Sequence, residues 1–78
     1  MVHADDYELV IFDVDLNLWR EGINFCKRIK ELANTPVLIL SSEFLEDKIR
    51  NFFDAGADKY LIKPFSKADL LKAIEELK

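Results

Sequence analysis

The sequence predicts an α/β fold in which a three-stranded parallel sheet is covered by helices. Three short apolar runs alternate with three amphipathic stretches, in the order β-α-β-α-β-α. Such alternation implies right-handed crossovers between parallel strands, with helices packed on the faces of the sheet. The apolar runs contain almost no polar residues, which is typical of strands covered on both faces. We therefore expect one three-layer domain over residues 1–78.

Each expected strand ends at a polar side chain. The first strand covers residues 9–12 and ends at Asp13, the second covers 37–40 and ends at Ser41, and the third covers 60–62 and ends at Lys63. Ligands of open α/β sheets bind beyond the carboxyl ends of the strands. We therefore expect these three polar side chains to lie at one edge of the sheet.

The three intervening stretches have helical periodicity. Apolar residues recur three or four positions apart within residues 23–33, 45–53 and 70–77. Ser66, with Asp69 three positions later, is typical of a helix N-cap. Gly56 follows the second stretch, where glycine can end a helix in the left-handed conformation.

Composition narrows the class of protein. Half of the residues are hydrophobic and a third are charged, which indicates a folded domain. The net charge of −4 argues against a nucleic-acid partner. No apolar run approaches the roughly 20 residues of a membrane-spanning helix. Because the N-terminus also lacks the pattern of a signal peptide, we expect no membrane contact and a cytoplasmic location.

An acid, a hydroxyl and a lysine at one edge of a sheet could form a phosphoryl site. A carboxylate such as Asp13 can act as a nucleophile or as a ligand of a hard cation. The hydroxyl of Ser41 and the ammonium of Lys63 can hold phosphoryl oxygens. The alternative interpretation is that these are ordinary polar residues of loops, which share no function. Residue spacing does not decide between a phosphoryl site and this alternative.

Residues 8–77 resemble the second part of the receiver domain of bacterial response regulators, a CheY-like family with a flavodoxin-like fold. The resemblance depends on four blocks, which are residues 8–13, 22–30, 35–42 and 55–65. The block Ala-Gly-Ala-Asp-Lys-Tyr-Leu-Ile-Lys-Pro-Phe at 55–65 is the most specific of them. Together the blocks stand in the order of the family and nearly at its spacing.

The resemblance implies a role for each candidate residue. Asp13 matches the phosphoacceptor, and Lys63 and Ser41 match residues that contact the phosphoryl group. Ser41 and Tyr60 match the pair that switches conformation. Asp13 and Asp15 fall where the family binds Mg²⁺. In the family, the peptide bond after the lysine is usually cis, which the proline at position 64 permits.

Two departures from the family pattern put phosphorylation in doubt. The family begins with a β-α-β segment that this chain lacks, and an acid pair in that segment holds Mg²⁺. The pair Asp5-Asp6 precedes the Asp13 strand and would lie at its opposite end, so we expect Mg²⁺ to bind weakly at best. The loop after Asp13 also differs, because it carries the apolar residues Leu18 and Trp19. Either Trp19 packs onto its own helix or it contacts a partner.

The missing segment also exposes an edge of the sheet. In the strand order of the family, 2-1-3-4-5, this chain would supply strands three to five. The Asp13 strand would then be a bare apolar edge, which favours pairing with another strand. We expect a homodimer that joins two Asp13 strands antiparallel into a six-stranded sheet and so completes the fold.

Three functions are compatible with these residues. The first is a degenerate receiver-like domain of two-component (phosphorelay) signalling that is not an enzyme and acts as a homodimeric protein-interaction module, with Asp13 at the phosphoacceptor position. The second is a working phosphoacceptor that a partner histidine kinase phosphorylates. The third is a fragment similar to haloacid-dehalogenase-type phosphatases, with Asp13 as nucleophile and Asp15 as acid/base.

Overall fold

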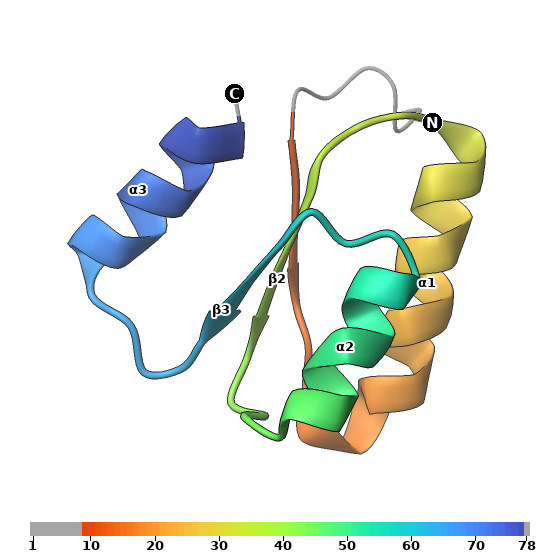
Figure 1. The fold of residues 1–78 in the computed structure, drawn as a ribbon, viewed down its shortest axis with the longest axis horizontal. Helices are drawn as coiled ribbons and strands as arrows, with labels where there is room; N and C mark the ends of the chain where they lie inside the picture. The colour runs from red at the N-terminus through yellow and green to blue at the C-terminus, as the bar shows by residue number, and fades with distance from the viewer. Residues whose placement is uncertain (1–8, 78) are drawn as a thin grey trace.

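Three parallel strands form the sheet of the structure, a computed structural model that describes residues 9–77 (Figure 1). The strands are β1 (Val10–Asp13), β2 (Val37–Ser41) and β3 (Lys59–Ile62), in the order β1-β2-β3. Val10 is in register with Val37, and Ile39 with Tyr60. The predicted class, strand order and parallel pairing are therefore confirmed.

Helices cover both faces of this sheet. A short 3-10 helix, η2 (Leu16–Leu18), leads into α1 (Trp19–Leu32), and α2 (Glu46–Asp54) follows β2. Figure 1 shows α1 and α2 on one face and α3 (Lys67–Leu77) on the other. Within the described residues, no helix has the length and apolar character needed to cross a membrane.

The larger core lies between the sheet and the helices α1 and α2. Its buried members are Val14, Cys26, Val37, Ile39, Phe52, Ala55 and Ala57. Phe52 is fully buried and lies edge-on to the ring of Trp19, with their centroids 6.3 Å apart. Trp19 therefore packs within its own domain, where its ring contacts Phe52 of α2 as well as the core beside its own helix. Cys26 is fully buried in this core, and its burial raises the pKa of the thiol.

A smaller core lies on the opposite face, under α3. Leu38 and Leu40 of β2 are buried there against Ala73 of α3. Outside this core, Lys59 of β3 forms an ion pair with Glu76 of α3. The central strand β2 is thus buried on both faces, which explains why its five residues are almost entirely apolar.

A polar clamp positions the start of β2 at the end opposite the candidate site. The carboxylate of Asp58 accepts a hydrogen bond from the Val37 backbone N–H at 2.8 Å. The same carboxylate oxygen pairs with the Lys30 ammonium at 3.0 Å. The Lys30 ammonium also donates to the Thr35 carbonyl, so α1, the strand entry and the turn before β3 are held together.

Replacement of Gly56 by alanine is expected to lower the free energy of unfolding by about 1–2 kcal/mol. Gly56 has a φ of 107°, and a Cβ added there would come within 2.7 Å of the Lys30 side chain. Urea unfolding measures the loss. Gly56→Asn serves as the comparison, because asparagine tolerates positive φ better than alanine does. Equal stability of wild type and Gly56→Ala would contradict the strained backbone.

Candidate functional site

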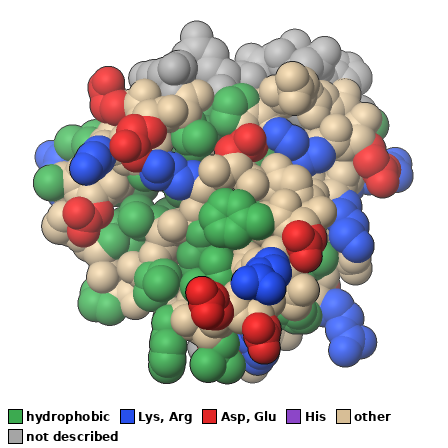
Figure 2. Space-filling model, viewed as in Figure 1, with side chains coloured by type: hydrophobic (Ala, Val, Ile, Leu, Met, Phe, Trp, Pro, Cys, Tyr) green, Lys and Arg blue, Asp and Glu red, His purple; other side chains and the backbone are tan. Residues whose placement is uncertain are grey.

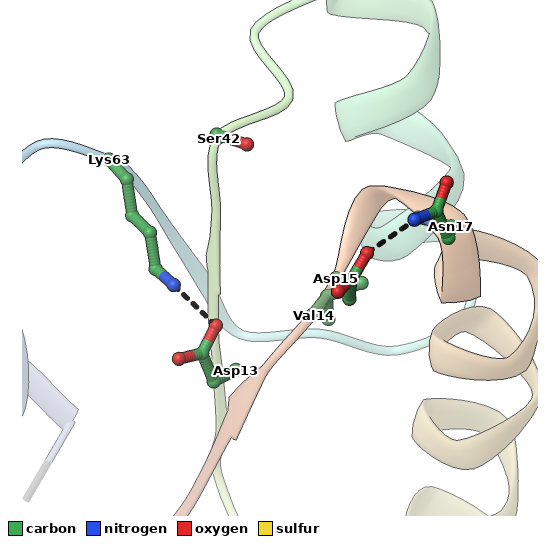
Figure 3. Close-up of a pocket in the computed structure, with 6 residues that line it drawn as sticks. All are labelled: Asp13, Val14, Asp15, Asn17, Ser42 and Lys63. Atoms are coloured by element: carbon green, nitrogen blue, oxygen red, sulfur yellow. Dashed lines mark hydrogen bonds and ion pairs between the residues drawn. The ribbon is translucent and has the colours of Figure 1, made fainter.

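Asp13 and Lys63 meet beyond the carboxyl ends of the strands (Figure 3). Asp13 is the last residue of β1, and Lys63 directly follows β3, anchored by its N–H to the Ser41 carbonyl at 2.8 Å. The Lys63 ammonium lies 2.6 Å from a carboxylate oxygen of Asp13. The Asp13 side chain is 63% exposed, so this ion pair stands at the surface. The expected cis peptide bond between Lys63 and Pro64 is present.

An open pocket of about 640 Å³ surrounds this pair. Its lining consists of Asp13, Val14, Asp15, Asn17, Ser42 and Lys63. The two carboxylates in the pocket point in different directions (Figure 3). Asp13 turns toward Lys63, whereas Asp15 caps η2 by accepting a hydrogen bond from the Asn17 N–H at 2.8 Å. The two acids therefore do not converge on one point.

The hydroxyl that faces the pocket comes from Ser42. Ser41 is fully buried, and its hydroxyl oxygen accepts a hydrogen bond from the Glu43 N–H at 3.1 Å. The resemblance placed Ser41 beside the phosphoryl group, and that role stays a prediction. Residue spacing did not single out Ser42 or Asn17. The only signal for Ser42 is its place directly after the strand-ending serine.

Tyr60 connects β3 to the loop after β2. Its hydroxyl donates a hydrogen bond to the Glu43 carbonyl at 2.8 Å. Its ring packs against Phe52, with centroids 5.8 Å apart. Burial raises the pKa of Tyr60, and a side-chain hydrogen bond with Ser41 opposes part of this change. The resemblance assigned Ser41 and Tyr60 to the switch, and that role stays a prediction.

Tyr60 is expected to ionise above pH 10, the approximate pKa of an exposed tyrosine. Because its pKa is raised in the folded state, the folded protein loses stability as pH rises through that value. The absorbance of phenolate during an alkaline titration measures the ionisation. Subtracting the titration of Tyr60→Phe isolates Tyr60 from Tyr7. A Tyr60 signal that develops at or below pH 10 would contradict the prediction.

The loop after β2 forms an apolar rim beside the pocket. Phe44 and Leu45 are both exposed there. Figure 2 shows hydrophobic side chains protruding at the lower end of the molecule, where this loop lies. Glu43 braces the loop, because its carboxylate accepts from the Phe44 N–H and pairs with Lys48 at 3.1 Å. The bond with Lys48 is also the main cause of the lowered pKa of Glu43.

The described residues fit Mg²⁺ poorly. Residues 9–77 contain no group of three or more histidine, cysteine or acidic side chains placed to hold a metal. Mg²⁺ prefers an octahedral set of oxygens. Asp13 and Asp15 diverge, and one oxygen of Asp13 is already paired with Lys63. The pair Asp5-Asp6 lies outside the described residues.

Comparison with known proteins identifies relatives over almost the whole chain. The model of the response regulator receiver domain matches residues 1–75. The chain is 41% identical over 78 residues to the transcriptional regulatory protein BasR of Escherichia coli, covering 97% of this chain and 34% of BasR. It is 40% identical over 68 residues to PdtaR of Mycobacterium tuberculosis, covering 87% of this chain and 33% of PdtaR. The chain thus spans about a third of these curated relatives.

A solved structure gives the same result for the fold. The chain aligns with a two-component response regulator from Clostridium difficile with a TM-score of 0.80 and 21% identity, covering 97% of this chain and 69% of that one. This likeness establishes the flavodoxin-like arrangement of strands and helices. The matched family model establishes the family, and the chain belongs to the response regulator receiver domains of two-component systems.

Proposed function

We propose that the chain is a degenerate receiver domain that acts as a homodimeric interaction module in two-component signalling and is not an enzyme. The observation that carries this proposal is the isolated ion pair of Asp13 and Lys63. Phosphoryl transfer requires positioning and neutralisation of charge, to which a metal ion contributes much. Asp13 holds the phosphoacceptor position, but no second carboxylate of the described residues converges on it.

The edge of β1 supports the homodimer. Within the described residues, β1 pairs with β2 on one side and has no strand on the other. No strand of residues 9–77 pairs with its backbone groups on that side, and such edges favour pairing. A second copy joined at β1 would extend the sheet to six strands and cover apolar side chains beside the edge. The cytoplasmic location expected from the sequence belongs to the same proposal.

Sedimentation velocity at micromolar concentration tests the homodimer. We expect a dimer of the 78-residue chain, with unfolding that depends on protein concentration. A monomeric species that unfolds cooperatively at the same concentration would overturn this part of the proposal.

The apolar rim at Phe44 and Leu45 offers a separate surface to another signalling protein.

A working phosphoacceptor is the second candidate function. The exposure of Asp13 in an open pocket favours it, as does a Lys63 ammonium close enough to neutralise a phosphoryl oxygen. A partner histidine kinase would then have to supply what the pocket lacks. Phosphotransfer from such a kinase, lost in Asp13→Asn, would establish this function. Transfer that is undetectable in both proteins supports the degenerate domain.

The geometry gives little support to phosphatase activity. In that chemistry Asp13 would be the nucleophile and Asp15 the general acid/base, so both must reach the same substrate. Asp15 instead caps η2 and points away from Asp13. We expect no steady hydrolysis of p-nitrophenyl phosphate, and turnover that disappears in Asp15→Asn would revive this function.

A further inference from the structure

A second apolar stripe runs along α1, apart from its core contact. Leu18, at the end of η2, is followed at intervals of seven residues by Phe25 and Leu32. Phe25 and Leu32 therefore lie on one side of α1, and Leu18 is the N-cap residue directly before the helix begins. Their exposed fractions are 54%, 40% and 63%. The buried side of α1 is formed by Gly22 and Cys26, and the three residues of the stripe lie outside both core clusters.

The stripe lies on the flank of α1 that borders the free edge of β1. The ring of Phe25 packs on Phe12 of β1, with centroids 4.4 Å apart. The other flank of α1 faces the segment after α2, where Lys30 pairs with Asp58 and lies beside Gly56. The exposed stripe and the free strand edge therefore form one continuous surface.

Ile11 occupies the middle of that strand edge. The N–H groups of Val10 and Val14 donate to carbonyls on the β2 side. Because alternate residues of a strand direct their backbone groups to opposite sides, Ile11 directs its N–H and carbonyl outward. Its side chain is 44% exposed, although it stands beside Phe12 in an apolar strand. The edge thus offers both backbone pairing and apolar contact.

We propose that two copies of the chain pack across a two-fold axis that passes near Ile11 and Phe25. This inference rests on the proposed homodimer and specifies its interface. The β1 strands run antiparallel, and the α1 helices pack along their exposed stripes on one face of the joined sheet. The stripe is symmetric about its centre, because Phe25 meets its own copy while Leu18 meets the partner's Leu32. Isologous contacts require this self-complementarity.

Charges beside the stripe complement each other across the same axis. Glu21 and Arg28 stand seven residues apart on its solvent side, too far along the helix to pair within one copy. Neither forms an ion pair within the part of the chain that the structure describes. Antiparallel packing brings Glu21 of each copy opposite Arg28 of the other, so the interface gains two symmetric pairs.

This interface leaves the two pockets independent. Because the β1 strands run antiparallel, their carboxyl ends and the two Asp13 residues lie at opposite ends of the joined region. Neither pocket receives an acid from the described part of the other copy. The assembly therefore buries apolar surface, and residues 9–77 of the two copies complete no metal site in it.

Charge exchange at these positions tests the interface. We expect Glu21→Arg and Arg28→Glu each to weaken self-association about tenfold, because both symmetric pairs become repulsive. An equimolar mixture of the two variants should form heterodimers, and the double variant should regain the homodimer. Sedimentation equilibrium measures each case. Glu75→Arg on α3 and Arg50→Glu on α2 are the controls and should leave association unchanged.

A cysteine crosslink tests the axis on β1. Ile11→Cys should form an oxidised dimer, since opposed residues of a hydrogen-bonded antiparallel pair have a Cα separation near 5.5 Å. Ile62→Cys, on β3 and 42% exposed, is the matched control and should not crosslink. The native Cys26 is fully buried in the structure, so we expect it to take no part in the crosslink.

The outcomes separate this inference from the proposed homodimer. The interface is supported if Glu21→Arg and Arg28→Glu form heterodimers when they are mixed and if Ile11→Cys forms a crosslinked dimer. If the wild type is a dimer and Glu21→Arg and Arg28→Glu leave its dissociation constant unchanged, the proposed interface is wrong. The homodimer would then form through another surface. A wild-type monomer would overturn both.

Discussion

Replacement of Phe52 by alanine is expected to lower the free energy of unfolding by about 3–5 kcal/mol. Phe52 is fully buried in the core between the sheet and α2, where its ring packs against both Trp19 and Tyr60. Truncation removes these contacts and leaves a cavity that the rigid sheet cannot close. Small domains have a total stability of roughly 5–15 kcal/mol, so the loss is a large share of it. Urea denaturation at fixed protein concentration measures the change.

The neighbouring residue Phe53 provides a matched control. Phe53 occupies the next position of α2 but is 45% exposed, and it lies outside both core clusters. Phe53→Ala should cost less than about 1 kcal/mol. Similar losses in the two variants would contradict the packing of α2. Because Tyr60 rests on Phe52, Phe52→Ala should also shift the Tyr60 titration toward that of an exposed tyrosine.

This pair of phenylalanines shows the limit of periodicity in the sequence. The helical spacing of apolar residues predicted a helix through 45–53, and α2 (Glu46–Asp54) confirms it. The same pattern contained both Phe52 and Phe53 and could not say which one faces the sheet. That choice depends on long-range contacts with Trp19 and Tyr60. Local periodicity carries no information about contacts at such separations in the chain.

The candidate site shows a similar division. The rule that strand ends converge at one edge brought Asp13 and Lys63 together from positions 50 residues apart, and their ion pair confirms it. The rule could not predict where each side chain points. Asp15 turns to cap η2, and Ser41 is buried while Ser42 faces the pocket. Local capping and the alternation of side chains along β2 decide these directions.

Phosphorylation of Asp13 by acetyl phosphate in the presence of Mg²⁺ is expected to be at least about a hundredfold slower than in the matched domain of BasR, because no second carboxylate of residues 9–77 converges on Asp13. The attack of Asp13 on a phosphoryl group brings two negative groups together, and Mg²⁺ would have to neutralise them. The Lys63 ammonium offsets only part of this charge. It is also already paired with Asp13 at 2.6 Å, so that contact must rearrange before the carboxylate can react.

Intact-mass measurement of the phosphorylated fraction over time gives this rate, with Asp13→Asn as the blank. The receiver domain of BasR, assayed under the same conditions, serves as the reference. Labelling of Asp13 at the rate of that reference would contradict the prediction. It would show that the pocket binds Mg²⁺ through residues outside 9–77 and that the working phosphoacceptor is the correct function. Slow labelling that Mg²⁺ does not accelerate would instead indicate that Lys63 is the main positive charge that offsets the phosphoryl group in the pocket. In that case Lys63→Ala should abolish the remaining labelling of Asp13.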